Sequence, residues 1–372
     1  MDFAFTPEHE ELRQTVRRFL QDRSDEATVR RLMVTDEGFD RSTWAQLAEQ
    51  LGLTALIVPE TYGGSGLGPV ELAITLEEMG RALFCAPYFS TAVLSVAALN
   101  EAASDEAKQE LLPEIAAGKK IVALALAEPQ GIWEPADVRL RARKGRNGWT
   151  LTGEKTAVID GHVADELLVV ARTPEGLSLF RVRGNADGLE RVPLPALDLT
   201  RKLARVRFSK TPAESVAAAP DVQPQLERAF LLGLAALAAE QVGGAQQCLE
   251  LSTQHAKTRW QFGRPIGSFQ AIKHRCADML VAVEFAKSAA YHAAFRAAEG
   301  NGSDLAVAAR MAKSYCSDAY FQVANDTIQV HGGMGFTWEH PAHLYFKRAK
   351  SSALLFGDPV HHREKLAALI GI

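Results

Sequence analysis

The sequence has few cysteines and no excess of positive charge. Of its 372 residues, four are cysteine, and the formal net charge is −4. Nucleic-acid-binding domains normally carry a basic face, so we expect no nucleic-acid partner. The cysteines lack the spacing of metal ligands, and three of them lie in stretches with helical patterning, which favours reduced, buried thiols. They are Cys85, Cys248, Cys276 and Cys316.

Long apolar runs are also missing. The longest, Phe230 to Ala239, has about half of the ~20 residues that a membrane-spanning helix needs. Residues 1–20 carry charges of both signs on an amphipathic pattern, unlike a secretory signal peptide. We therefore expect a cytoplasmic protein with no membrane partner.

Histidines do cluster near the C-terminus, but their spacing matches no common zinc pattern. We therefore expect no metal ion. The clustered residues are His331, His340, His343, His361 and His362.

The pattern of apolar residues divides the chain into three parts. Residues 1–120 have helical periodicity, with a helix start at Thr6–Pro7 and a Gly-rich loop at 58–68. Further helical stretches cover 70–83, 87–99 and 105–118. We expect an N-terminal α-helical domain in this range.

Residues 121–215 have a different texture, because short segments rich in β-forming residues follow one another closely. An apolar run at 121–128 comes first, and the segments 138–144 and 149–155 flank a hairpin signal, Gly145-Arg146-Asn147-Gly148. Later segments continue the pattern at 166–173, 177–183 and 204–208. We expect a small antiparallel β domain, either a barrel or a pair of packed sheets.

Helical periodicity returns in residues 216–372 with long elements and few breaks. The expected helices cover 225–258, 270–299 and 303 to about 331, followed by a terminal pair. The predicted fold is therefore a multidomain α+β chain. It has an N-terminal α-helical domain (1–120), a middle antiparallel β domain (121–215) and a C-terminal four-helix-bundle domain (216–372).

An unusual turn separates two of these long helices, within residues 258–279. Gly and Pro are dense enough there to break a helix, and Ser268 can cap the next one. The break displays a guanidinium, an aromatic ring and an amide, from Arg259, Phe262 and Gln270. These groups suit a ligand with phosphates and a flat heterocycle, because arginine binds phosphate through two hydrogen bonds and an aromatic ring offers a stacking face. A plain helical hairpin explains the Gly and Pro residues equally well.

Four motifs in this order resemble the acyl-CoA dehydrogenase family, over essentially the whole chain. They are VPETYGGSGLG (58–68), ALAEP (125–129), RWQFGRPIGSFQAI (259–272) and IQVHGGMGF (328–336). The resemblance implies an FAD-binding homotetramer or dimer of dimers that removes hydrogens from the α and β carbons of an acyl-CoA thioester. A carboxylate takes the α proton, the β hydrogen leaves as hydride to the flavin, and an electron-transfer flavoprotein accepts the electrons. The cofactor carries the redox chemistry, while the protein supplies position, dryness and a base.

Two sets of positions match family residues that reach across a subunit interface to the pyrophosphate and adenine end of FAD. In the second set, glycine lets the backbone come close to the cofactor. A role in the core or in a helix C-cap is the structural alternative for each residue alone. The first set is Arg259, Phe262 and Gln270, and the second is Gln329, Gly332 and Gly333.

The chain departs from the family where the catalytic base is expected. The loop before the last helix usually holds a Glu, but the resemblance places Phe356 there. A minority of the family holds the base near the start of the long helix after the β domain, and that position is Gly233. In the middle domain, Ala157 and Ile159 replace a Trp and a Thr that contact the flavin ring, and the loop 130–137 lacks the usual Ser and Thr residues.

One hypothesis accounts for both departures. Family relatives exist in which two different chains form a heterotetramer with active sites on only one kind of chain. The sequence then predicts a subunit that completes the FAD site of a partner chain. The competing hypothesis is a self-sufficient enzyme with a relocated carboxylate base, and a third is a non-enzymatic scaffold that has lost FAD.

Three carboxylates are candidates for a relocated base. Glu240 lies in an apolar run, where desolvation raises the pKa of a carboxyl group, but a buried structural Glu paired with a neighbouring Arg or amide is slightly favoured. Asp358 lies in the expected loop, but an Asp before Pro is also an ordinary helix cap. Glu227 begins the long helix, where the helix dipole favours acidic residues.

The resemblance places the segment PYFSTAVLS (87–95) and the helix 70–78 along the acyl pocket. Their side chains are mostly small or apolar, which permits a bulky or long acyl chain. Heteromeric relatives act on steroid-derived or dicarboxylic acyl-CoA thioesters, so both remain candidate substrates.

Overall fold

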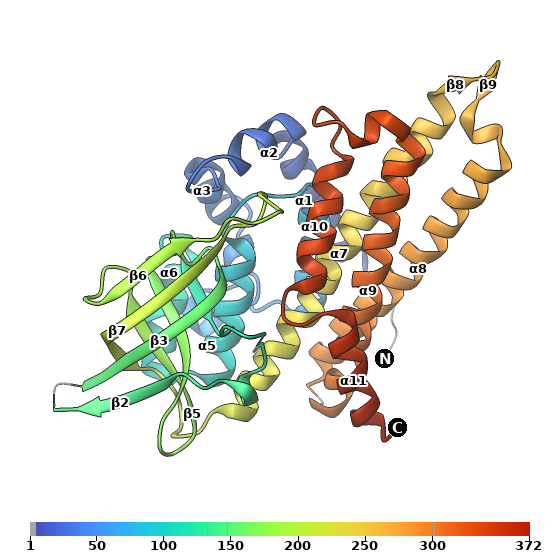
Figure 1. Ribbon diagram of the computed structural model, residues 1–372. Coiled ribbons are helices and arrows are strands. Elements are labelled where there is room, and N and C mark those ends of the chain that lie inside the picture. Colours follow the sequence, from blue (N-terminus) through green and yellow to red (C-terminus); the bar gives the residue numbers. More distant parts are fainter. Residues whose placement is uncertain (1–4, 132, 147, 301) are drawn as a thin grey trace. The chain divides into compact units, whose positions relative to one another are not determined.

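The computed structural model describes residues 5–372 except Ile132, Asn147 and Asn301. The described chain forms two compact units (Figure 1). The first contains residues 1–30, 69–84 and 234–372, and the second contains residues 31–68 and 85–233. The range expected as an N-terminal helical domain is thus shared between the two units. Asn147 of the predicted hairpin turn, Ile132 of the 130–137 loop and residues 1–4 lie outside the described residues.

The first unit is helical. Its α1 begins where the sequence predicts, since the Thr6 hydroxyl accepts a hydrogen bond from the His9 backbone N–H (3.4 Å) and His9 Nδ1 accepts one from the Thr6 N–H (3.2 Å). The main elements are α1 (Pro7–Arg23), the first part of α2 (Glu26–Met33), α4 (Pro69–Arg81), α7 (Gln223–Thr258, from Leu234 on), α8 (Gln270–Glu299), α9 (Gly302–His331), α10 (Ala342–Leu354) and α11 (Pro359–Ile370).

Glycine lets α4 and α7 approach each other very closely in this unit. A Cβ atom on Gly243 would lie 1.7 Å from the carbonyl oxygen of Glu77, and one on Gly80 would lie 1.9 Å from the carbonyl oxygen of Glu240. Any side chain at these two positions would force the helices apart. The contact therefore fixes α4, from the N-terminal part of the sequence, against the C-terminal bundle.

The second unit combines short helices with a sheet. The helical elements are α3 (Arg41–Glu49), η1 (Leu53–Ala55), η2 (Glu60–Tyr62), a π-helical segment η3 (Phe89–Ser95), α5 (Val96–Ala102), α6 (Asp105–Ala116) and η4 (Pro135–Asp137). The strands are β1 (Val122–Ala125), β2 (Arg141–Gly145), β3 (Gly148–Ile159), β4 (Glu166–Arg172), β5 (Leu177–Arg183), β6 (Leu189–Pro193) and β7 (Leu203–Ser215).

The sheet closes on itself as a barrel. The strand order is β1-β4-β2-β3-β7-β5, and β4 also pairs with β5, which completes the ring. The predicted hairpin forms, with Gly145 paired to Gly148. Most pairs are antiparallel as expected, but β1 and β2 run parallel to β4. The long connection from β1 to β4, which contains the β2–β3 hairpin, is what allows a parallel crossover.

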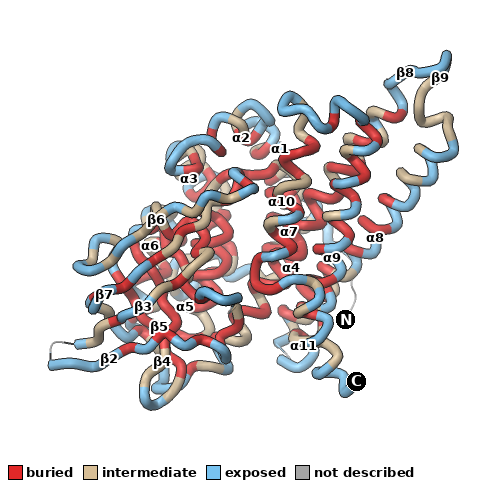
Figure 2. The backbone as a smooth tube through the Cα atoms, in the orientation of Figure 1, coloured by how far each residue is buried: buried red, intermediate tan, exposed pale blue. Residues whose placement is uncertain are grey.

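Buried residues of this unit are concentrated on β4 and β5, on η3 and on α5 (Figure 2). Six of the seven residues of β4 are buried, which explains why it reads as a continuous apolar run rather than an alternating one. The sequence did not predict β6, an edge strand without buried residues that ends in Pro193. Such a strand has a weak sequence signal, because buried and exposed residues do not alternate along it.

Candidate functional site

The predicted turn between α7 and α8 is present, and it projects from the first unit (Figure 1). After α7 the chain forms a two-residue hairpin, β8 (Trp260–Gln261) and β9 (Arg264–Pro265), and then a short 3₁₀ turn, η5 (Ile266–Ser268). The N-cap position of α8 is Phe269, without a side-chain cap, so the predicted cap at Ser268 is wrong. Ser268 is instead the last residue of the 3₁₀ turn, and Phe269 lies between it and the first residue of α8.

The hairpin displays aromatic side chains to solvent. The Phe262 side chain is 90% exposed and that of Trp260 is 61% exposed, while Arg259 and Gln270 are also exposed. Phe262 has φ +53°, a backbone conformation that costs a residue other than glycine about 1–3 kcal/mol. Within the described chain the Phe262 ring meets the Phe269 ring edge to face, with centroids 6.1 Å apart, and otherwise remains exposed. These side chains are therefore available to a ligand or to another chain.

The second predicted set lies where α9 ends. After His331 the chain turns through η6 (Gly332–Phe336), and Gln329, Gly332 and Gly333 are exposed. A Cβ atom on either glycine would meet no other atom within 4 Å, and Gly332 has φ +61°. The backbone here is open enough for a large group to approach closely. Both turns thus leave room for a large group, and a role for their residues in holding a dinucleotide cofactor stays a prediction.

Three histidine rings lie against one another beside these two sets, tilted by 31° and 45°, and are here called the histidine stack. The His331 ring lies 4.3 Å from the His255 ring and 4.2 Å from the His340 ring, measured between ring centroids. Burial lowers the pKa of all three groups, and for His340 to about 4. The sequence grouped His331 with His340 but missed His255, because α7 is brought beside them only by the fold.

The position expected for the family's usual base lies in a tightly held loop after α10. Phe356 is buried, with φ +61°, and its carbonyl oxygen accepts a hydrogen bond from His362 Nε2 (3.0 Å). Lys313 Nζ is fully buried and donates to the carbonyl oxygens of Ala353 (3.0 Å) and Gly357 (3.1 Å). The loop is thus fixed from both sides, around a side chain that cannot take a proton.

The alternative base position, Gly233, is filled by a neighbour. A Cβ atom on Gly233 would lie 2.8 Å from Cδ2 of Leu94, which belongs to the π-helix η3. All seven residues of η3 are buried, and the hydroxyls of Thr91 and Ser95 donate to the carbonyl oxygen of Val122 (3.0 and 2.9 Å). This segment was expected along the acyl pocket, and π-helical turns are frequent at functional sites. Here it occupies the space that a longer side chain at Gly233 would need.

Strand β3 carries Ala157 and Ile159, the two positions where the family resemblance expects partners of the flavin ring. Its register against β7 shifts between Lys155 and Val158, and Ala157 in this bulge has φ +48°. Ile159 is buried and offers no hydroxyl group. Lys155 is fully buried and donates to Glu128 Oε1 (2.8 Å) and to the Leu126 carbonyl oxygen (2.9 Å). Burial lowers the pKa of Lys155 to about 8. The Lys155–Glu128 ion pair is a structural link across the barrel.

The comparisons with known proteins agree with these motifs. The acyl-CoA dehydrogenase N-terminal domain matches residues 6–119, and the acyl-CoA dehydrogenase C-terminal domain matches residues 225–370. Acyl-CoA dehydrogenase IpdE2 of Mycobacterium tuberculosis is 37% identical over 352 residues, which cover 95% of this chain and 94% of that protein. The chain belongs to the acyl-CoA dehydrogenase family. IpdE2 of Mycolicibacterium smegmatis is 34% identical and covers 97% of this chain and 98% of its own length.

Solved structures of the family extend this likeness to the fold. The ChsE4–ChsE5 complex from Mycobacterium tuberculosis superposes with a TM-score of 0.90 and 29% identity, covering 100% of this chain and 99% of that chain. A variant of the Tcur3481–Tcur3483 steroid ACAD gives 0.89 and 29%, covering 98% of each chain. The predicted order of helical, β and helical parts is therefore the acyl-CoA dehydrogenase fold, and the predicted membership of this oxidoreductase family is confirmed.

The three candidate carboxylates of this acyl-CoA dehydrogenase chain each make the contact expected of a structural residue. Glu240 Oε1 accepts from Arg348 Nη1 (2.5 Å), and both side chains are buried. The Asp358 carboxylate caps α11 by accepting from the His361 N–H (2.8 Å). Glu227 accepts from Gln223 Nε2 (2.8 Å); it was expected to begin the long helix, but α7 begins at Gln223 and its first turn has no acidic residue. A catalytic role for Glu240 or Asp358 stays a prediction.

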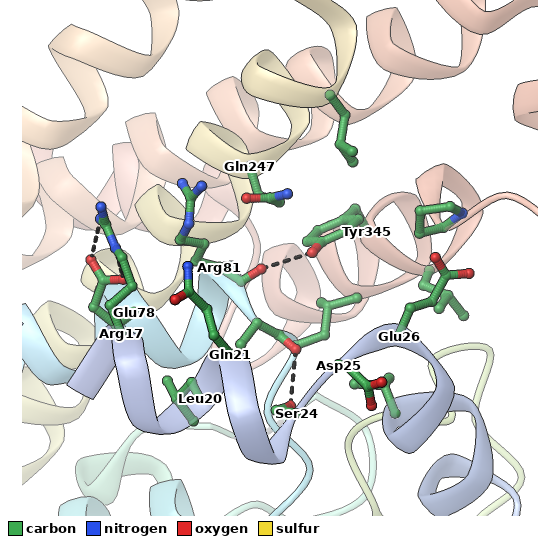
Figure 3. Close-up of a pocket in the computed structure, with 16 residues that line it drawn as sticks. Arg17, Leu20, Gln21, Ser24, Asp25, Glu26, Glu78, Arg81, Gln247 and Tyr345 are labelled. Atoms are coloured by element: carbon green, nitrogen blue, oxygen red, sulfur yellow. Dashed lines mark hydrogen bonds and ion pairs between the residues drawn. The ribbon is translucent and has the colours of Figure 1, made fainter. Parts of the chain in front are cut away.

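A cavity of about 330 Å³ lies in the first unit of this acyl-CoA dehydrogenase chain, among α1, α4, α7 and α10 (Figure 3). Its arginines already have partners: Arg17 binds Glu78 (2.7 Å) and Arg81 binds Glu250. The Tyr345 hydroxyl donates to the Arg81 carbonyl oxygen (2.7 Å). Because both guanidinium charges are neutralised from within, the cavity has no site prepared for an anion.

Two expected absences concern metals and membranes. Within residues 5–372, outside the three gaps, no group of three or more His, Cys, Asp or Glu side chains is arranged to hold a metal ion. No helix in the described chain is long and apolar enough to cross a membrane.

Proposed function

We propose that this chain is a subunit of a heteromeric, FAD-dependent acyl-CoA dehydrogenase, in which it completes the FAD site of a catalytic partner chain. One contrast carries the proposal. The residues proposed for the distal end of FAD are displayed on exposed turns, whereas neither position expected for a base holds a carboxylate. One is the buried Phe356, and the other is Gly233, where a Cβ atom would lie 2.8 Å from the Leu94 side chain.

When bound, FAD supplies the hydride acceptor for the α,β-dehydrogenation of the acyl-CoA thioester. This chain contributes binding groups: the guanidinium of Arg259 suits the pyrophosphate, the ring of Phe262 offers a stacking face, and the Gly332–Gly333 backbone allows close approach. These groups lie on exposed surface, which fits a cofactor held mainly by another subunit. One of the similar solved structures, the Tcur3481–Tcur3483 steroid ACAD variant, is likewise named after a pair of chains.

An apolar strip on the first unit offers a surface for such a partner. The exposed side chains are Leu280 (48%), Val281 (54%) and Phe285 (61%) on α8, with Met311 (37%) and Tyr315 (39%) on α9. The Phe285 and Tyr315 rings pack edge to face, with centroids 6.4 Å apart. Contiguous apolar surface of this kind is typical of a subunit interface.

The substrate class follows from the relatives rather than from a visible pocket. One similar solved structure is named as a steroid ACAD, which supports a steroid-derived acyl-CoA as substrate. A dicarboxylic acyl-CoA is the second candidate. We expect an electron-transfer flavoprotein to reoxidise the enzyme and expect the enzyme to act in the cytoplasm.

Flavin stoichiometry tests the proposal. The chain is expressed alone and together with the product of a neighbouring dehydrogenase gene, and bound FAD per chain is measured by absorbance after denaturation. We expect little FAD on the chain alone, and about one FAD for every two chains in the active complex. One FAD per chain and acyl-CoA dehydrogenase activity in the isolated protein would instead favour the self-sufficient enzyme with Glu240 or Asp358 as base. A colourless complex would favour the non-enzymatic scaffold.

A further inference from the structure

The stacked histidines connect the two parts of the distal cofactor surface. His255 lies in the last turn of α7, four residues before Arg259, and His331 directly precedes Gly332. His340 directly precedes Pro341, the N-cap of α10. The three rings therefore join segments that are far apart in the sequence. With ring centroids 4.2 and 4.3 Å apart, the middle ring of His331 is in contact with both neighbours.

The hydrogen bonds of two of these rings define their neutral forms. His331 Nδ1 lies 2.8 Å from the Thr327 carbonyl oxygen, which can only accept, so Nδ1 carries the proton. His340 Nδ1 accepts from the Ala342 backbone N–H (3.2 Å), so the proton of the neutral ring is on Nε2. A second proton on His340 must therefore go to Nδ1, where it removes the bond that holds the first residue of α10.

Charged neighbours also lower the pKa values of His255 and His340. Arg259, directly after α7, lies near His255, and Arg30 of α2 lies near His340. His343 of α10 also faces His340 and itself has Lys347 and Glu26 nearby. Burial is the largest cause of the lowered pKa values of the three stacked rings, and these mostly positive neighbours add to it for His255 and His340. The stack is thus neutral at pH 7, and acid places like charges on adjacent rings.

We propose that His331 is a positioning residue: stacked between His255 and His340, it holds the α7–α8 turn and the Gly332–Gly333 turn in register for the cofactor, and acid protonation of the stack releases both turns together. The naming of the cofactor rests on the proposed function. The mechanical coupling of the two turns does not, because it needs only contacts within this chain.

Hydrogen–deuterium exchange of the full chain without cofactor tests the coupling, with rates corrected for the intrinsic effect of pH. We expect the segments 255–270 and 329–341 to keep the same protection between pH 8 and 6 and to lose it below pH 5 with one shared midpoint. His331→Phe keeps an aromatic ring but cannot be charged, so both segments should stay protected at least about half a pH unit further into acid. His274→Phe, which changes an exposed histidine of α8, should match the wild type.

Separate midpoints for the two segments, or a His331→Phe midpoint equal to that of the wild type, would overturn the proposal. His331→Ala removes both ring contacts and should expose both segments already at pH 7. If that variant unfolds, His331→Phe still decides the question. Retention of FAD by the two-chain complex, followed by flavin fluorescence, should fall at the same pH as the protection. A complex that never holds FAD would refute the proposed function and leave the exchange result standing.

Discussion

The buried ion pair between Glu240 and Arg348 gives the sharpest test of how this chain works. The Glu240 and Arg348 side chains are 8% and 4% exposed, and Oε1 lies 2.5 Å from Nη1. If Glu240 is structural, Glu240→Gln takes the Glu240 carboxylate away from the buried Arg348 guanidinium. If Glu240 is the relocated base, the same change abolishes proton abstraction and leaves the fold almost intact.

The size of the structural effect follows from burial. Removing one partner of a buried ion pair costs about 3–5 kcal/mol, because the remaining charge stays desolvated. The amide oxygen of Gln can still accept one hydrogen bond, so we expect about 3 kcal/mol for Glu240→Gln. In a domain of 150–250 residues this corresponds to a decrease in melting temperature of about 6–12 °C.

Thermal and urea unfolding measure this loss, and a double-mutant cycle assigns it. Glu240→Gln combined with Arg348→Met removes both charges and should recover much of the stability lost in the single variant. Glu250→Gln is the matched control on α7: its partner is Arg81, but the Glu250 side chain is 44% exposed, so the change should cost less than about 1 kcal/mol.

The outcome that contradicts this reasoning is clear. A Glu240→Gln variant with unchanged stability, in a flavin-loaded complex that acyl-CoA no longer reduces, would make Glu240 the base. The same assay on Asp358→Asn tests the second candidate. Retained flavin reduction in both variants would leave the base on the partner chain.

Three further predictions concern packing, assembly and pH. Gly243→Ala places a methyl group 1.7 Å from the Glu77 carbonyl oxygen and should cost about 3 kcal/mol or more in urea unfolding, whereas Gly333→Ala, which meets no atom, should cost little. Phe285→Asp changes a 61% exposed ring and should leave unfolding unchanged but shift the complex to smaller species in size-exclusion chromatography. Burial lowers the pKa of His362 to about 3, whereas the unfolded chain takes up this proton near pH 6.5, so stability falls as pH drops below about 6.5. Relative to His362→Phe, the wild type should lose about 2 kcal/mol of unfolding free energy between pH 7 and 5.

The parts of the site that the sequence predicted correctly have local signals. Gly263, Pro265 and Gly267 mark the break between α7 and α8, and the hairpin forms there. Gln270 was predicted as the first residue of a long helix, and α8 begins at that residue. Turn chemistry of this kind depends on a residue's own backbone preferences, so a single sequence carries it.

The parts that sequence reasoning missed depend on distant segments meeting. His255 joins the histidine stack only because α7 lies beside the end of α9, and no residue near His255 indicates this. Ser268 looked like a helix cap because its residue type is right, but its position is set by the η5 turn. The parallel pairing of β1 with β4 likewise follows from closure of the barrel, since each strand alone has an ordinary apolar pattern.

At the two positions where the family resemblance expects a base, packing as well as residue type disfavours a carboxylate. A Glu at Gly233 would need the space that Leu94 occupies, and a Glu at Phe356 would be buried in a loop whose carbonyl groups are already bound by Lys313 and His362. Restoring a carboxylate at either position alone therefore meets a neighbour that must move first. The exposed turn beyond α7 is under no such constraint within this chain. This contrast between an open turn and two base positions without a carboxylate supports the proposed role of the chain in a site on another subunit.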